Sequence, residues 1–195
     1  MTPDDLLLAH EEMISTQDTS APAAPPISLD EAKRQLKIEL ADTSQDDEIA
    51  DFIADAVAWV EKYTGHLLTP RDVTERFAGF GRMRLKAWPI ASDATVTLAY
   101  DGPGVVTTIV GARLSVADRP AEVLPPLALA WPRVAVTTGV TVTVRAGYAD
   151  PASVPGNLRR AMLLLIGGYD EGGEALELAV KLARDQCRDF RARKL

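Results

Sequence analysis

The spacing of apolar residues changes twice along the chain. From residue 28 they recur every three or four positions, from 66 to 148 they alternate with polar residues, and from 155 the first spacing returns. An amphipathic helix buries a residue about every 3.6 positions, whereas a half-buried strand buries every second one. The pattern therefore predicts two helices, a β-rich insert and two further helices.

The first two predicted helices carry clear end signals. Ser28 can cap the first, and Glu31 follows at the spacing of a capping box. The second begins in the acidic stretch 46–48, which suits the positive end of a helix, and Gly65 is positioned to end it. Both helices show an apolar stripe that predicts packing against other elements.

The middle of the chain predicts about six short antiparallel strands. These stretches are rich in Val and Thr and are separated by Gly, Pro and Asp. The sequence DGPG at 101–104 is a hairpin loop signal between two of them. Strands of this number and length indicate a small sandwich or barrel.

The predicted fold class is α+β: an antiparallel helical core of about four helices with an inserted small antiparallel β domain. Residues 155–169 are apolar almost all round, as in a helix buried on several sides. The expected parts are a flexible N-terminal arm (1–26), the first half of the helical core (27–65), the β-rich insert (66–148), the second half of the core (149–181) and a basic C-terminal docking tail (182–195).

Charge is unevenly distributed. The formal net charge is −7, yet residues 1–64 alone hold 15 acidic against 4 basic residues. An acidic surface repels the DNA backbone, so sequence-specific DNA binding by this part is not expected. Ordinary solubility explains the excess better than a lining for passing DNA. The sequence has no apolar run long enough for a membrane span, and we expect a soluble intracellular protein.

The candidate chemistry is sparse. One cysteine, Cys187, and two histidines cannot form a Cys/His metal cluster. Asp47, Asp51 and Asp55 lie at i, i+4 and i+8, a spacing that can bind a cation, face water or meet a basic surface of a neighbouring subunit. A solvated face is favoured over a metal-dependent hydrolase. We assign no catalytic, cofactor-binding or metal-binding residue, and we expect no cofactor.

The last fifteen residues are basic, with Phe190 and Leu195 flanking the terminal arginines. A basic helix end matching the macrodipole explains the excess by itself. Aromatic residues beside arginine are also typical of interface anchors. The residues alone favour neither a docking tail nor a fraying one.

Three motifs occur in order: ISLDEAKRQLKI, then DDEIADFIADAVAWVEKYTGHLL, then VTVRAGYADPASVPGNLRRAMLLLIGGYDE. With the Val- and Thr-rich middle, they resemble the head-to-tail connector (adaptor) proteins of long-tailed phages and of gene transfer agents. The resemblance covers about residues 27–173. The first 26 residues and the basic tail depart from the shortest family members.

The resemblance implies a structural protein that is not an enzyme. Family members form a ring, commonly a dodecamer, beneath the portal protein, and they extend the DNA channel and offer a surface for the next connector (stopper) or the tail. DNA passes without sequence-specific binding, and no membrane is involved. The implied location is the head-tail junction of a virion or phage-like particle, assembled in the bacterial cytoplasm. A protein-binding module without a ring is the remaining alternative.

The resemblance also implies roles for particular residues. The C-terminal segment of such proteins reaches toward the portal, which places Phe190, Arg191, Arg193, Lys194 and Leu195 at a predicted portal interface. Arg159 and Arg160 lie in the first turn of a predicted helix, where positive charge opposes the dipole. We therefore expect them, together with Asp47, Asp51 and Asp55, at the interface between subunits.

Overall fold

Helices and strands separate into two units along the chain. The computed structural model describes residues 13–18, 24–102, 105–133 and 139–191. The β unit consists of β1 (Met13–Asp18) and residues 71–147, and the helical unit consists of residues 24–70 and 148–191. The strands of residues 71–147 therefore belong to a unit of their own, and the chain leaves the helical unit after residue 70 and re-enters it at residue 148.

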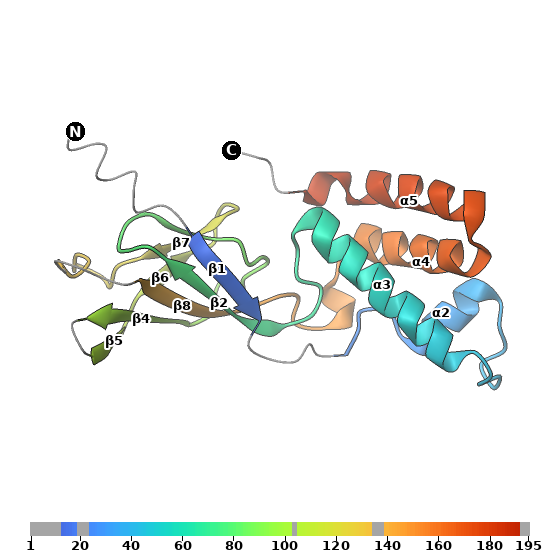
Figure 1. The fold of residues 1–195 in the computed structure, drawn as a ribbon, viewed down its shortest axis with the longest axis horizontal. Helices are drawn as coiled ribbons and strands as arrows, with labels where there is room; N and C mark the ends of the chain where they lie inside the picture. Colours follow the sequence, from blue (N-terminus) through green and yellow to red (C-terminus); the bar gives the residue numbers. More distant parts are fainter. Residues whose placement is uncertain (1–12, 19–23, 103–104, 134–138, 192–195) are drawn as a thin grey trace. The chain divides into compact units, whose positions relative to one another are not determined.

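The helical unit contains the four predicted helices (Figure 1). They are α2 (Leu29–Leu36), α3 (Asp46–Thr64), α4 (Gly156–Glu171) and α5 (Gly173–Cys187). Two single-turn 3₁₀ helices, η1 (Pro151–Ser153) and η2 (Arg188–Phe190), precede α4 and follow α5. The prediction of an α+β fold with four helices is confirmed for the described residues.

The predicted end signals act as expected. The Ser28 side chain accepts a hydrogen bond from the Glu31 backbone N–H at 3.2 Å and caps α2. Gly65 ends α3 at φ 67°, a left-handed conformation that glycine adopts without steric cost, and its N–H donates to the Glu61 carbonyl at 2.7 Å. Gly172 and Gly173, also at positive φ, form the turn from α4 to α5.

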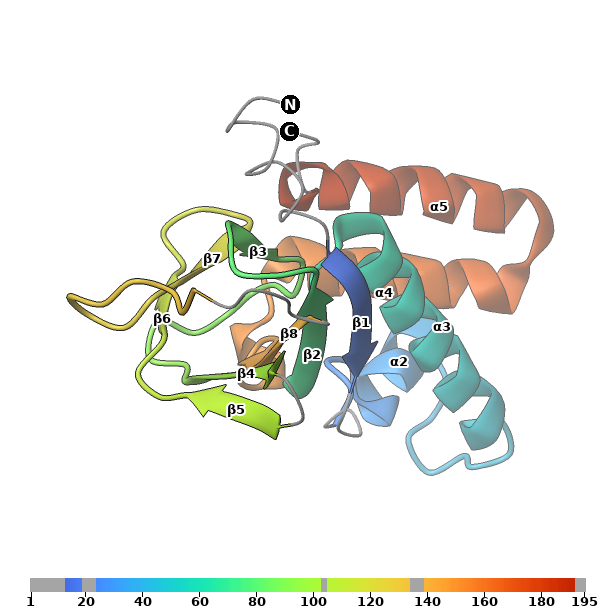
Figure 2. The ribbon, with the colours of Figure 1, turned by 60° about the vertical axis from the view of Figure 1, so that its left-hand side comes forward.

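Helix α4 is the centre of the helical unit and contacts α2, α3 and α5 (Figures 1 and 2). This explains its apolar character on several sides. Its fully buried residues are Leu158, Ala161, Met162, Leu165 and Ile166. Near its C-terminus Gly168 lets α5 approach closely, because a Cβ atom there would lie 2.6 Å from the Cβ of Ala179.

The β unit contains two antiparallel sheets (Figure 2). The five-stranded sheet has the order β1-β2-β8-β4-β5, formed with β2 (Arg71–Phe77), β4 (Val96–Gly102), β5 (Val105–Ile109) and β8 (Val140–Ala146). The three-stranded sheet has the order β3-β7-β6, formed by β3 (Met83–Leu85), β6 (Arg113–Ser115) and β7 (Ala121–Leu124). All pairings are antiparallel, as predicted.

The register of β2 against β8 directs one face of the large sheet inward. Val73 lies opposite Val144 and Phe77 opposite Val140, and all four side chains are buried. The alternation of Val and Thr in β8 therefore follows the alternation of buried and partly exposed positions. Glu75 lies on the same buried face of β2 as Val73 and Phe77.

Two strands differ from the sequence expectation. Strand β1 lies within residues 1–26, expected to be a flexible arm, and it pairs with β2 from Met13 to Asp18. Strand β7 follows a Pro-containing turn and is only four residues long. The sequence MISTQD of β1 shows no clear alternation, whereas β7 alternates buried and partly exposed positions over only four residues. Both signals are too weak to predict a strand, and tertiary pairing determines both. Residues 1–12, 19–23 and 134–138, the last from another predicted strand, lie outside the described residues.

Candidate functional site

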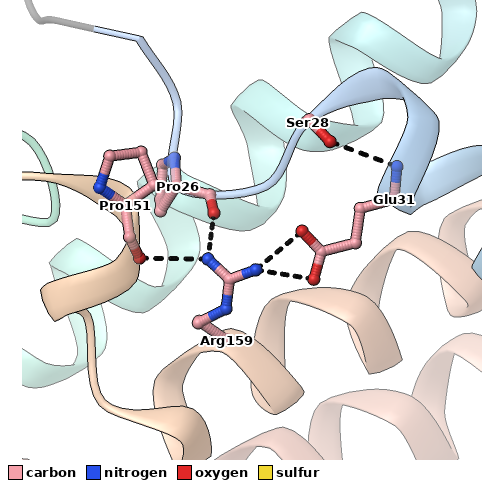
Figure 3. A network of polar contacts seen from close by, with 5 residues as sticks. All are labelled: Pro26, Ser28, Glu31, Pro151 and Arg159. Atoms are coloured by element: carbon pink, nitrogen blue, oxygen red, sulfur yellow. Dashed lines mark hydrogen bonds and ion pairs between the residues drawn. The ribbon is translucent and has the colours of Figure 1, made fainter.

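Arg159, in the first turn of α4, is the centre of the densest polar network in the described helical unit (Figure 3). Its Nη2 donates to both carboxylate oxygens of Glu31 at 2.7 Å. Its Nη1 donates to the carbonyl of Pro26 at 2.6 Å and to that of Pro151 at 3.0 Å. One guanidinium thus connects the start of α2, the segment before it and the turn before α4.

This network gives the positive charge of Arg159 a negative partner that the spacing within α4 does not reveal. The carboxylate of Glu31 neutralises a cation at the positive end of α4, and the side chains of Arg159 and Glu31 are only 26% and 27% exposed. The mismatch that suggests a subunit contact therefore has a partner within the subunit. Arg160 is exposed. The subunit contact stays a prediction for both arginines.

Lys33 holds the loop between α2 and α3. Its side chain is 2% exposed, and its ammonium donates to the carbonyl of Asp42 at 2.7 Å and to that of Leu40 at 3.4 Å. It also forms an ion pair with Asp46 at 2.5 Å. Because a buried ammonium needs such partners, this lysine fixes where α3 begins. On a helical wheel Lys33 lies beside Leu29 and Leu36 on the apolar side of α2, yet no role was predicted for it.

The acidic row Asp47, Asp51 and Asp55 lies on the exposed side of α3, as the spacing predicts. Asp55 is close enough to α4 to help raise the pKa of Tyr169, for which burial is the larger cause. No group of three or more potential metal ligands occurs in the part of the chain that the structure describes. The acidic row is a solvent-facing surface of the helical unit, and its subunit contact stays a prediction.

The C-terminal segment continues from α5 along the helical unit. Phe190 is partly buried against the helical core, and its ring meets His66 edge-on at 5.7 Å between centroids. The guanidinium of Arg191 lies 4.9 Å from the centre of the Tyr63 ring, a cation–π arrangement. Arg193, Lys194 and Leu195 lie outside the described residues, so their portal contact stays a prediction.

A second pair of rings completes this anchor. The His66 ring is buried, with its Nδ1 2.9 Å from the Tyr148 hydroxyl, and it stacks on the Tyr148 ring. Tyr148 follows the last strand of the β unit directly, and His66 follows the end of α3. Phe190 thus contacts a histidine whose ring is already held in place. No local pattern in the sequence indicates this pairing, because His66 and Tyr148 are more than eighty residues apart.

Two buried ionisable groups have structural explanations. Burial raises the pKa of the Cys187 thiol to about 11, so the group is neutral at ordinary pH and unsuited to nucleophilic attack. Glu75 is fully buried, and its carboxylate accepts hydrogen bonds from the backbone N–H groups of Lys86 and Ala87 at 3.1 and 2.8 Å. Burial raises its pKa, against the effect of these donors. Glu75 therefore braces the segment after β3.

Among the helices of the described ranges, none is both long and apolar enough to span a bilayer. No protein-family model and no curated protein matches the chain. Three solved structures contain a chain of similar fold, and each match covers 93% of this chain and 97% of the other.

The three structures come from gene transfer agent (GTA) particles. One is the neck of an empty GTA particle computed with C6 symmetry, at 22% identity and a TM-score of 0.72. Another is the virion of a native gene transfer agent particle, at 22% identity and a TM-score of 0.73. The third is the neck of a native GTA particle computed with C12 symmetry, at 20% identity and a TM-score of 0.72. At this identity the likeness shows that the fold is shared.

Proposed function

We propose that this chain is a structural neck protein, an adaptor that joins the head and the tail of a tailed phage or of a gene transfer agent particle. The observation that carries the proposal is the fold match over 93% of this chain and 97% of a chain from such particles. The match includes both units, so it is not limited to a common helical motif. The sequence resemblance over residues 27–173 supports the same role independently.

The proposed assembly is a ring of identical subunits beneath the portal protein. The neck of the native GTA particle was computed with C12 symmetry, which supports a dodecamer. A cyclic ring requires two different, complementary faces on each subunit. The role is structural rather than enzymatic, and the ring extends the channel through which DNA passes. The acidic excess of residues 1–64 suits a surface that does not hold passing DNA.

The C-terminal segment is the proposed portal contact, and the structure refines its extent. Ala183 and Cys187 are buried in the helical core, and Phe190 packs against it. We therefore propose that the portal contact starts at Arg191 rather than at residue 182. We propose that Phe190 anchors the segment on its own subunit, while Arg191, Arg193, Lys194 and Leu195 contact the portal. The other face of the ring receives the next connector or the tail.

The proposal is tested by electron microscopy of particles from cells that produce the full chain with an affinity label. We expect a labelled ring at the junction of head and tail. A variant in which residues 192–195 are replaced by Gly-Ser-Gly-Ser should keep the fold and bind the portal more weakly. The matched control is Lys62→Ser, which removes an exposed positive charge elsewhere in the helical unit. Particles that assemble normally without the chain would contradict the proposal.

A further inference from the structure

The outer side of α5 combines exposed leucines with positive charge. Leu178 and Leu182 are 57% and 40% exposed, although they lie on a helix that buries its other face in the core. Lys181, Arg184 and Arg188 run beside them and are exposed. Exposed large apolar residues at one helical spacing, next to charge of one sign, are typical of a surface that another protein covers.

Acidic and basic residues are segregated along α5. The acidic Glu174 and Glu177 lie at its N-terminal end, and Asp185 forms an exposed ion pair with Arg188 at 2.6 Å. In the described ranges, neither Lys181 nor Arg184 forms an ion pair. The second half of α5 therefore presents positive charge that the described part of its own subunit does not neutralise.

The exposed side of α3 has the complementary composition. Asp47, Asp51 and Asp55 form its acidic row, and Ala50, Ala54 and Ala58 form a row of small exposed residues beside them. The eight steps along the helix from Asp47 to Asp55 rise about 12 Å, and the seven steps from Lys181 to Arg188 rise about 10 Å. The two charged rows are therefore of matching length.

We propose that the α3 face of one subunit docks against the α5 face of the next subunit, a second copy of this chain. The acidic row of α3 meets the basic row of α5, and Leu182 lies on Ala50, the first residue of the alanine row. This inference rests on the proposed ring and identifies its two complementary faces. Both faces belong to the helical unit, so the contact does not depend on the placement of the β unit.

The relative direction of the helices fits a ring. Within one helical unit, α3 and α5 run in the same general direction (Figures 1 and 2). Neighbours in a twelve-fold ring differ by a rotation of about 30° around the ring axis. Helix α3 of one subunit and α5 of the next therefore also run in broadly the same direction, and an antiparallel contact is not available.

The order of the rows around each helix agrees with that direction. On a helical wheel drawn at 100° per residue, the aspartate row of α3 lies at larger angles than the alanine row. On the wheel of α5, the basic residues lie at smaller angles than the two leucines. When two helices face each other in parallel, opposite sides meet, as g meets e in a parallel coiled coil. Acid then meets base while leucine meets alanine.

Paired cysteines test the contact in assembled particles. The pair Ala50→Cys with Leu182→Cys joins positions at matching heights along parallel helices, and both positions are exposed. Oxidation should link successive subunits into a ladder of disulfide-bonded multimers. The control pair, Ala58→Cys with Leu178→Cys, is offset by about 20 Å along parallel helices and should remain unlinked. The native Cys187 is buried and does not compete.

Charge exchange provides the second test. Asp51→Lys with Asp55→Lys should lower incorporation of the chain into particles at least about tenfold, because like charges then face each other. Lys181→Glu with Arg184→Glu should do the same, and the four changes together should restore incorporation. The control, Arg34→Glu with Arg133→Glu, reverses two exposed charges outside both rows and should have no such effect.

The outcomes separate the two levels of the proposal. If the ring is present but the Ala50 and Leu182 cysteines do not link, or the charge reversals leave incorporation unchanged, this contact is wrong while the neck function stands. If the chain is absent from the neck, the proposed function fails and this contact fails with it. Linking of the control pair alone would indicate antiparallel docking and would also overturn the inference.

Discussion

Reversing the charge of Arg159 should destabilise the helical unit, whereas the same change at Arg160 should have little effect. Both arginines lie in the first turn of α4, so the sequence treats them alike. In the structure Arg159 donates four hydrogen bonds, two of them to Glu31, whereas Arg160 is exposed. Arg159→Glu with Arg160→Glu as the control therefore compares identical chemical changes at adjacent positions.

The magnitude follows from the partners that Arg159 has. A hydrogen bond to a charged group contributes about 1.5 to 3 kcal/mol, and partial exposure lets Glu31 regain water when the guanidinium is removed. We expect Arg159→Ala to lower the free energy of unfolding by about 2 to 3 kcal/mol. Arg159→Glu adds repulsion with Glu31, whose upper limit at 4 Å is about 4 kcal/mol, so we expect a loss of about 3 to 5 kcal/mol. Arg160→Glu should change stability by less than about 1 kcal/mol.

Urea unfolding followed by circular dichroism at 222 nm measures this difference, since the described α-helices all belong to the helical unit. With a denaturant slope of about 1 to 3 kcal/mol per molar, Arg159→Ala should lower the midpoint by about 0.7 to 3 M. Hydrogen exchange should rise at the start of α2 in the Arg159 variants alone. Equal midpoints for Arg159→Glu and Arg160→Glu would refute the assignment of Arg159 to a structural network.

Three further changes probe the packing of the helical unit. Gly168→Ala should destabilise it by about 1 to 3 kcal/mol because the new Cβ would clash with Ala179. Gly167→Ala, with no neighbour closer than 3.9 Å, should instead raise its stability by up to about 1 kcal/mol. Equal thermal midpoints for the two variants would contradict this. Lys33→Met removes the hydrogen-bond donor to the loop carbonyls and should lower the free energy of unfolding by about 2 kcal/mol. Hydrogen exchange in residues 38–45 should rise, and unchanged exchange would show that the lysine is free in solution. Cys187, with a thiol pKa raised to about 11 by burial, should react with a thiol reagent at pH 8 only after denaturation, and rapid labelling of the folded protein would show that it is accessible.

Helices and their ends were predictable because their signals are local. Ser28, Gly65 and the Gly172–Gly173 turn act through residues within four positions, and each lies where the sequence places it. The hairpin signal at 101–104 likewise joins β4 to β5. Strand β1 was not predictable in this way, because MISTQD has no clear alternation and becomes a strand only by pairing with β2, more than fifty residues away.

The same distinction between local signals and tertiary contacts applies to the candidate site. The acidic row of α3 was placed correctly on an exposed face, since helical spacing alone determines it. The partners of Arg159 depend on which helices pack together, and those of Lys33 depend on the path of the loop after α2. The spacing within one helix determines neither. For Arg159, a signal was nevertheless present: an unbalanced cation in a helix's first turn indicates a nearby carboxylate, and Glu31 was already marked as part of a cap.

The position of Phe190 changes what the basic C-terminal segment is expected to do. The ring of Phe190 contacts His66 within its own subunit, and its portal contact stays a prediction. The cation–π arrangement holds Arg191 beside Tyr63. Binding by a segment that starts from a fixed point requires less ordering than binding by a free one, so fewer contacts are needed for the same affinity. A short basic segment repeated around a ring would then bind the portal through many weak contacts at once, which makes the junction firm without a large interface on any single subunit.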